Sequence, residues 1–441
     1  MRQIHLAGFL NAGGVIHSHA SWRHPQTDLG FLQPELYQNI GRILERGRFD
    51  LAFFADRLAV SDCYGGDIGF ALQYGAQDAI RLDSIPILAL MAGSTHYLGL
   101  GATRSTTYYQ PFQIARVFAT LDHLTRGRIA WNVVTSMNDS EAQNFGFEQH
   151  LEHDTRYDRA DEFVEVAFKL WNSWQDEALI LDRENGIFVD RSKVDYIHHA
   201  GQWFKSRGPL NIPRSPQGRP VIIQAGSSGR GKEFAARWAE VVFTIQRTPE
   251  LMKAFYQDVK ATVIKHGRNP EDCLILPAVM LFIAETEALA KEKQEFHNEL
   301  VHPLSGLSTL SGHLNYDFAQ HPLKELVSRS SGTTATDYKI NNIAKISEEQ
   351  GLTLEEIGKL YGASVLVPQI VGTPEQVADY LESVFREEAC DGFVISPAYL
   401  PGSFEEFVEF IIPELQRRGL FRTDYTGKTL REHLGLKKPN K

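Results

Sequence analysis

Short apolar runs alternate with longer amphipathic segments along almost the whole chain. One unit shows the pattern well: an amphipathic segment ends at 119–125, an Arg-Gly-Arg turn follows, and an apolar run within 127–136 ends in polar residues. Such a unit predicts a helix, a tight turn and a buried strand of an α/β fold. Eight strands are predicted in this way: 4–9, 51–55, 97–103, one within 127–136, 220–225, 240–245, 274–283 and 392–396.

Amphipathic helices are predicted between these strands. Residues 34–47 place their apolar side chains on one face, and residues 157–174 do the same. Pro111 is placed to begin a third helix, at the position where its missing N–H costs nothing. Eight strand–helix units favour an α/β fold of the (β/α)8 TIM-barrel type, as a single domain over 1–441.

Two insertions interrupt the regular alternation, at about 175–219 after strand four and about 285–365 after strand seven. Within the second, the pattern is weakest over 302–350, where Gly, Ser, His and Thr dominate. A segment of this length without regular structure is usually a functional lid or is disordered. We therefore expect an active-site lid within 285–365.

Composition narrows the function classes. The 441-residue chain has a formal net charge of −10 and a pI near 5.9, which argues against nucleic acid as a partner. Cys63, Cys273 and Cys390 form neither a disulfide framework nor a metal-binding spacing, so a reducing, cytoplasmic setting is expected. No apolar run approaches the roughly 18 residues of a membrane span, and residues 1–9 do not resemble a signal peptide. A small-molecule substrate is the remaining expectation.

In a barrel, the polar residues that follow each strand share one rim, and chemistry gathers there. Asp56, Thr103 and Asn132 all stand at such strand ends. Asp56 could bind hydroxyl groups or simply end its strand. Aromatic side chains close to the same rim add apolar surface.

The turn 226–229 reads Gly-Ser-Ser-Gly and opens a helix. Free backbone N–H groups at a helix start can hold a phosphate, with Ser227 and Ser228 beside it. The alternative is an ordinary serine N-cap, which is common before helices. His153 and Tyr157 lie four residues apart at another helix start, so both can face one way. They could hold a phosphate or a ribityl chain, or lie on a solvated helix start.

His17 and His19 follow strand one in a His-Ser-His pattern typical of metal-dependent barrel hydrolases. That mechanism needs further histidines and an Asp at later strand ends. Here strand four ends in Asn132 and strand eight in Ser396. A metal site is therefore not expected. The two histidines are instead expected to line a substrate pocket, to donate protons or to bond within the loop.

Several long motifs follow one another along the chain, at 22–25, 131–136, 144–146, 152–163, 224–231 and 413–419. Together and in this order they resemble the flavin-dependent monooxygenases of the bacterial luciferase-like superfamily. Within it, the chain is similar to the nitrilotriacetate and dibenzothiophene-sulfone monooxygenase group.

This resemblance implies a barrel that binds reduced FMN supplied by a separate NAD(P)H:FMN reductase. By motif match it also implies which residues contact the flavin. The implied phosphate contacts are Ser228 and Tyr157, and Asn132 would lie beside the isoalloxazine ring. The implied cofactor-binding residues are Asp56, Thr103, Asn132, His153, Tyr157, Ser227 and Ser228.

The chemistry implied is oxygenation by O2 of a small organosulfur or related compound, with cleavage of a C–S or C–N bond. His17, His19 and Asn132 are the candidate catalytic residues. Alkane-oxygenating relatives carry a Cys and a His where this chain has Gly13 and Met137, which argues against an alkane substrate. The resemblance also implies a homodimer or homotetramer. A deazaflavin-dependent oxidoreductase of the same superfamily and a non-catalytic flavin-binding protein are the alternatives.

Overall fold

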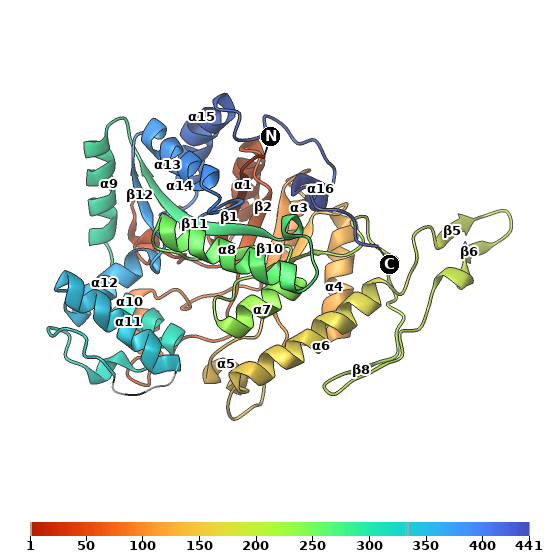
Figure 1. Cartoon of the computed structure of the whole chain (residues 1–441), viewed down its shortest axis with the longest axis horizontal. Coiled ribbons are helices and arrows are strands. Elements are labelled where there is room, and N and C mark those ends of the chain that lie inside the picture. Colours follow the sequence, from red (N-terminus) through yellow and green to blue (C-terminus); the bar gives the residue numbers. More distant parts are fainter. Residues whose placement is uncertain (1, 331, 333–334, 441) are drawn as a thin grey trace.

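The structure, a computed structural model, describes residues 2–330, 332 and 335–440. Eight parallel strands form a closed barrel, in which β10 pairs with β11 and the last strand returns to the first (Figure 1). The predicted barrel is confirmed. Its strands are β1 (His5–Asn11), β2 (Leu51–Ala55), β3 (Gly99–Ser105), β4 (Ile129–Val134), β9 (Val221–Gln224), β10 (Val241–Thr244), β11 (Leu274–Ile283) and β13 (Gly392–Ile395).

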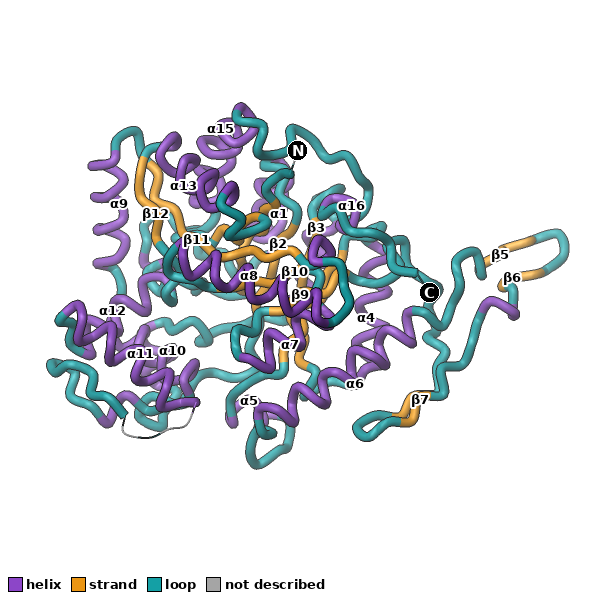
Figure 2. Tube along the Cα trace, viewed as in Figure 1, coloured by secondary structure: helices purple, strands orange, loops and turns teal. Residues whose placement is uncertain are grey.

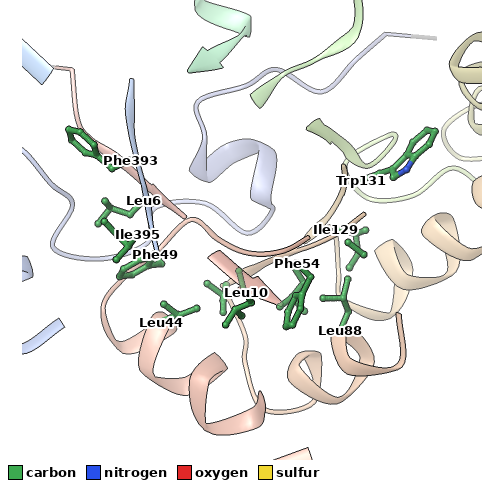
Figure 3. Close-up of a cluster of buried hydrophobic side chains, with 14 of the residues drawn as sticks. Leu6, Leu10, Leu44, Phe49, Phe54, Leu88, Ile129, Trp131, Phe393 and Ile395 are labelled. Carbon is green, nitrogen blue, oxygen red and sulfur yellow. The ribbon is translucent and has the colours of Figure 1, made fainter. Parts of the chain in front are cut away.

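Side chains alternate between the two faces of each strand, as the two-residue period of a strand requires. Phe54 points outward and packs with Leu10 and Leu88 between the strands and the helices (Figure 3). Phe53 points inward and packs with Phe9. Burial of each such side chain stabilises the fold by about 1.5–3 kcal/mol.

Helices cover the outside of the barrel (Figure 2). Pro occupies the first or second position of five of the helices named below, as a helix start favours. The helices that follow or precede barrel strands are α1 (Pro34–Arg46), α2 (Gly69–Tyr74), α3 (Ser84–Ala92), α4 (Pro111–Leu124), α5 (Asp139–Asn144), α6 (His153–Trp171), α7 (Gly229–Trp238), α8 (Pro249–Lys265), α9 (Glu287–Glu299), α13 (Pro374–Arg386), α14 (Gly402–Glu406) and α15 (Ile412–Arg417).

The C-terminal segment closes the N-terminal end of the barrel. Leu430 and Leu434, in and after α16 (Leu430–His433), join the apolar cluster inside the strands. The buried guanidinium of Arg431 donates to both carboxylate oxygens of Glu240, at 2.6 and 2.9 Å. Because this end is filled, the opposite end, where the strands terminate, is the one open to ligands.

Residues 302–350 are largely helical, which corrects the expectation of a structureless segment. They hold α10 (Pro303–Leu314) and α11 (Ala335–Gln350), and α12 (Leu354–Ser364) follows before β12 (Gln369–Gly372) pairs with β11. Residues 331, 333 and 334 of this stretch lie outside the described residues.

Close packing of small residues explains why the apolar pattern of residues 302–350 is weak in the sequence. A Cβ on Gly306 of α10 would meet the carbonyl oxygen of Gly358 at 1.8 Å, and one on Gly358 would meet the carbonyl oxygen of Pro303 at 2.5 Å. Glycine and serine therefore let α10 and α12 approach closely, and eight of the twelve residues of α10 are buried. When glycine and serine form the buried face of a helix, its sequence lacks the large apolar residues, three to four positions apart, that mark an amphipathic helix.

The segment between α6 and β9 forms two small hairpins that stand away from the barrel (Figures 1 and 2). The first pairs β5 (Leu179–Asp182) with β6 (Ile187–Val189), and the second pairs β7 (His199–Ala200) with β8 (Lys205–Ser206). Among the described residues, no helix is long and apolar enough to cross a membrane.

Candidate functional site

The carboxyl ends of the barrel strands surround a cavity of about 680 Å³. Side chains from the barrel, from α6, from the turn before α7 and from the α10–α12 segment line it. Six of the candidate residues identified in the sequence lie on its wall: His17, Asp56, Thr103, Asn132, Tyr157 and Ser227. His19, His153 and Ser228 do not line it.

Thr103 and Asn132 form the floor of this cavity. They stand side by side on β3 and β4, and the Asn132 Nδ2–H donates to Thr103 Oγ1 at 2.8 Å. Thr103 in turn donates to the carbonyl oxygen of Phe54 at 2.7 Å. Asn132 Oδ1 is buried and has no hydrogen-bond partner among the described residues. A buried amide oxygen without a donor costs about 1–3 kcal/mol, so this position is built to accept a hydrogen bond from a ligand.

Asp56 lies at the end of β2 beside Arg104, whose Nη1–H donates to the Asp56 carboxylate at 3.0 Å. The Arg57 backbone N–H also donates to it, at 2.9 Å. Burial raises the pKa of Asp56 to about 6, because the loss of solvation outweighs the attraction of Arg104. The carboxyl thus titrates just below neutral pH at the edge of the cavity.

A glycine-lined recess occupies the rim between α6 and α7. Gly226 and Gly231 let the turn before α7 approach Tyr157 closely: a Cβ at Gly226 would meet the Tyr157 hydroxyl at 3.0 Å, and one at Gly231 would meet it at 2.9 Å. Ser228 is the N-cap of α7, because its Oγ accepts the backbone N–H of Gly231 at 3.0 Å. The N-cap interpretation of this serine is confirmed. The recess combines backbone N–H groups, two hydroxyls and a helix N-terminus, the features that bind phosphate.

His153 begins α6 and approaches the same recess from outside. Its Nε2 lies 3.3 Å from Ser228 Oγ, and its Nδ1 lies 2.7 Å from the Asp154 carboxylate. The side chain is 46% exposed, so it contacts the outer edge of the recess and not the cavity. Tyr157, one turn later, is buried. The four-residue spacing therefore brings both residues to one side of the helix, as expected.

His17 lies over the inner end of the cavity. Its ring stacks on Phe9 with centroids 3.7 Å apart, and its Nδ1 shares a hydrogen bond of 2.7 Å with Ser396 Oγ. Burial holds the pKa of His17 well below its usual range, so the ring is neutral. A neutral imidazole fixed at Nδ1 presents Nε2 as its second polar atom.

His19 is placed differently. Its Nδ1 lies 3.2 Å from Ser305 Oγ and its Nε2 lies 3.3 Å from Thr309 Oγ1, both on α10. Burial lowers its pKa to about 4. Both ring nitrogens are therefore engaged in joining the first loop to α10, away from the cavity wall.

A buried charged cluster borders the cavity and was not identified in the sequence. Asp78 accepts from Arg57 at 2.6 Å and from Arg81 at 2.9 Å. Burial opposes ionisation of Asp78, but the two guanidinium charges overcome it and hold the pKa of the carboxyl well below its usual range. His313 of α10 shares a 2.7 Å hydrogen bond with the Tyr361 hydroxyl, and burial lowers the pKa of His313 to about 3. Arg57 directly follows Asp56, which was the only sequence signal for this cluster.

Metal chemistry finds no support in the arrangement of side chains. Within the described part of the chain, no group of three or more His, Cys, Asp or Glu residues is arranged to hold a metal ion. The cavity instead joins an unpartnered amide, a neutral imidazole, aromatic rings and a phosphate-type recess.

Comparison with known proteins shows the family to which the chain belongs. The model of the luciferase-like monooxygenases matches residues 34–391. The chain belongs to the luciferase-like monooxygenase family. It is 52% identical to the dibenzothiophene-sulfone monooxygenase of Rhodococcus erythropolis (strain XP), over 99% of this chain and 98% of that protein.

Two further proteins extend the comparison. Nitrilotriacetate monooxygenase component A of Aminobacter aminovorans is 44% identical over 99% of this chain and 97% of its own length. The crystal structure of a riboflavin lyase with modified FMN and riboflavin has a TM-score of 0.89 and 31% identity, and covers 99% of this chain and 96% of its own. The protein is thus similar to flavin-dependent monooxygenases over its whole length. Enzymes of this family use reduced FMN and O2.

The residues of the cavity fit that cofactor. The unpartnered Asn132 Oδ1 is an acceptor for a ring N–H, and the turn before α7 brings Gly226 and Ser227 to the cavity wall beside a helix N-terminus, where a phosphate is favoured. These two features lie on one cavity wall, together with Tyr157 and Ser227.

Proposed function

We propose that the protein is the oxygenase component of a two-component system. It uses reduced FMN and O2 to oxygenate a small organosulfur compound such as a sulfone or thioether, or a related molecule, with cleavage of a C–S or C–N bond. The observation that carries this proposal is that one cavity joins the unpartnered Asn132 amide to the Gly226–Ser227 turn that precedes α7.

FMN would be held at three places. The recess formed by Tyr157, Ser227 and Ser228 would receive its phosphate, with His153 at the outer edge. Asp56 and Thr103 would contact the flavin from the β2 and β3 side, and Asn132 would accept a hydrogen bond from the ring system. When bound, the reduced flavin supplies the electrons that activate O2.

The remaining wall of the cavity would orient the substrate. Phe9, Phe53 and Phe243 form an aromatic cluster with the neutral His17, with ring centroids between 3.7 and 6.2 Å apart. Such a surface suits an apolar, aromatic or sulfur-containing molecule. His17 would offer one hydrogen bond at this surface without carrying charge. His19, bonded on both nitrogens, would act by positioning α10.

The α10–α12 segment would serve as the lid of the single barrel domain. His313, Tyr361, Val365 and Leu366 reach the cavity from this segment. Their contribution would be to exclude water while oxygen and reduced flavin are present.

The partners follow from the chemistry. A separate NAD(P)H:flavin reductase would supply reduced FMN, and a homodimer or homotetramer is proposed for the oxygenase itself. The sulfone relative supports the organosulfur substrate, and the component A designation of the nitrilotriacetate relative supports a second component. A cytoplasmic location is proposed on the three free cysteines.

Reductase-coupled O2 consumption tests this proposal. With a flavin reductase, NADH and FMN, O2 uptake should rise when dibenzothiophene sulfone or a dialkyl sulfide is added, and hexadecane should have no effect. Hydride transfer from a reduced deazaflavin without O2 uptake would favour the oxidoreductase alternative. Flavin binding without substrate-dependent uptake would favour a binding protein.

A further inference from the structure

Arg81 is a buried cation on the cavity wall whose hydrogen-bonding capacity is only partly used. Its side chain is 8% exposed and lines the cavity at the strand ends. Nη2 donates to the Asp78 carboxylate at 2.9 Å, but Nε and Nη1 are buried and have no hydrogen-bond partner among the described residues. Donors on a buried charged group are costly to leave unpaired, so this guanidinium indicates a ligand that supplies acceptors.

The carboxylates nearby do not use these donors. Asp78 is shared between Arg81 and Arg57, whose guanidinium donates to it at 2.6 Å. Glu141, on the same cavity wall, instead accepts three backbone N–H groups, at distances between 3.1 and 3.3 Å. The Asp56 carboxylate is bonded to a different arginine. The charge of Arg81 is therefore balanced only in part, by one shared carboxylate.

Arg81 lies on the side of the cavity formed by the loop after β1 and by α10. The Leu82 backbone N–H donates to the carbonyl oxygen of Ala12 at 2.7 Å, which holds this part of the β2–β3 connection against that loop. Burial lowers the pKa of His17 and of His313, and the charge of Arg81 adds to the effect, so both neighbours are neutral. Most of the residues proposed to hold FMN come instead from β3, β4, α6 and the turn before α7. Arg81 therefore belongs to the part of the cavity left for the substrate.

A sulfone matches this part of the cavity in two ways. Its oxygens carry partial negative charge and accept hydrogen bonds without donating any, which suits a guanidinium with free N–H groups. The organic groups on its sulfur are apolar and suit the aromatic cluster of Phe9, Phe53 and Phe243. A thioether offers the same apolar body but no oxygen, and would leave Arg81 unpaired.

We propose that Arg81 selects the substrate: it donates from Nε or Nη1 to an oxygen of an oxidised sulfur, and so favours sulfones over thioethers. A site built to hydrogen-bond one group of a substrate rejects the analogue without that group, because its own buried polar atoms are then left unpaired. The inference rests on the proposed function and assigns a binding residue within the same cavity. Arg81 holds the substrate and takes no part in the transfer of oxygen.

Equilibrium dialysis against dibenzothiophene sulfone and dibenzothiophene, which differ only in the two oxygens, tests this role without flavin or turnover. The wild type should bind the sulfone about 10- to 100-fold more tightly, and Arg81→Met should bring the two affinities to within about threefold of each other. Arg81→Lys keeps the charge on a single nitrogen and should give an intermediate preference, so it serves the same test if the Met variant is unstable. In the reductase-coupled assay, Arg81→Met should raise KM for the sulfone about tenfold with little change in kcat.

Arg42→Met is the matched control, because Arg42 lies on the exposed surface of α1, and it should keep the wild-type affinities. Arg81→Met should remain folded, since Asp78 keeps its ion pair with Arg57, and the thermal unfolding midpoint checks this.

A wild type without preference for the sulfone, or a preference that survives Arg81→Met, would overturn the inference even if the protein consumes O2 with sulfones. Weaker binding of reduced FMN to Arg81→Met would assign Arg81 to the cofactor and overturn it as well. So would an Arg81-dependent preference for fluorene-9-carboxylate over the sulfone. An Arg81-dependent preference for the sulfone without any oxygenation would support the inference and contradict the proposed function.

Discussion

The Asn132 side chain donates to Thr103 Oγ1 at 2.8 Å, while its amide oxygen faces no donor among the described residues. The two residues are direct neighbours in the parallel pairing of β4 with β3, so both side chains point into the barrel. The hydrogen bond fixes the orientation of the amide. Its oxygen is thereby held in a position where only a ligand can satisfy it.

Replacement of Asn132 by Leu should weaken binding of reduced FMN by about 5- to 20-fold, or about 1–2 kcal/mol, because one hydrogen bond to the ligand is lost. The unfolding midpoint should change little, since Leu removes the hydrogen bond to Thr103 but also the buried oxygen that has no partner, and the Thr103 hydroxyl keeps its bond to Phe54. Anaerobic titration with reduced FMN measures the affinity. Gln257→Leu, on the exposed surface of α8, is the amide-to-leucine control. Unchanged affinity in Asn132→Leu would remove this residue from the flavin site.

Replacement of Ser228 by Asp should weaken binding of reduced FMN by about 30- to 100-fold, because a carboxylate would face the phosphate. Asp is also a good N-cap, so it should keep the hydrogen bond to Gly231 and the stability of α7. Reduced riboflavin, which has no phosphate, is the control ligand. Equal losses for FMN and riboflavin would place the phosphate elsewhere.

The pKa of Asp56 predicts a pH dependence of stability. Burial raises it from 3.8 to about 6, so the folded state binds a proton that the unfolded state has released over this interval. The stability contributed by the carboxyl is complete below about pH 4 and is lost as the pH rises through 6.

The Asp56→Asn variant has no carboxyl group that can titrate at this position. The free energy of unfolding of the variant, minus that of the wild type, should therefore rise by about 1 kcal/mol between pH 5 and pH 7. Urea unfolding at the two pH values measures this difference. A difference that stays level or falls over this range would show that Arg104 dominates over burial.

Local signals were sufficient to predict the barrel. Thr248 followed by Pro249 marks a helix start, and α8 begins there with the Thr248 hydroxyl capping the helix. The strand runs are apolar and short, and their order along the chain is the order around the barrel. The α10 helix was missed because Gly306 and its serine neighbours are buried by close helix contact, which produces no apolar period.

The candidate site was predictable only where residues follow strands or open helices. Asp56 directly follows β2, Thr103 and Asn132 lie two residues before the ends of β3 and β4, and Tyr157 and Ser227 lie near helix starts. The pairing of Asp78 with Arg57 joins residues 21 apart within the β2–β3 connection, and His313 reaches the cavity from α10. No local pattern predicts such contacts, because they depend on how this connection and the α10–α12 segment fold over the rim. The cofactor could be named only from the family resemblance. The Gly-Ser-Ser-Gly turn by itself fits either a phosphate site or a serine N-cap.

The most direct measurement of the central claim is the fate of labelled oxygen. The protein, a flavin reductase, NADH and FMN should be incubated with dibenzothiophene sulfone under ¹⁸O₂, and the products analysed by mass spectrometry. The account predicts a C–S-cleaved product that carries one ¹⁸O atom from O₂ and forms only when reduced flavin is supplied. A product that carries oxygen from water, or turnover that continues without flavin, would contradict it.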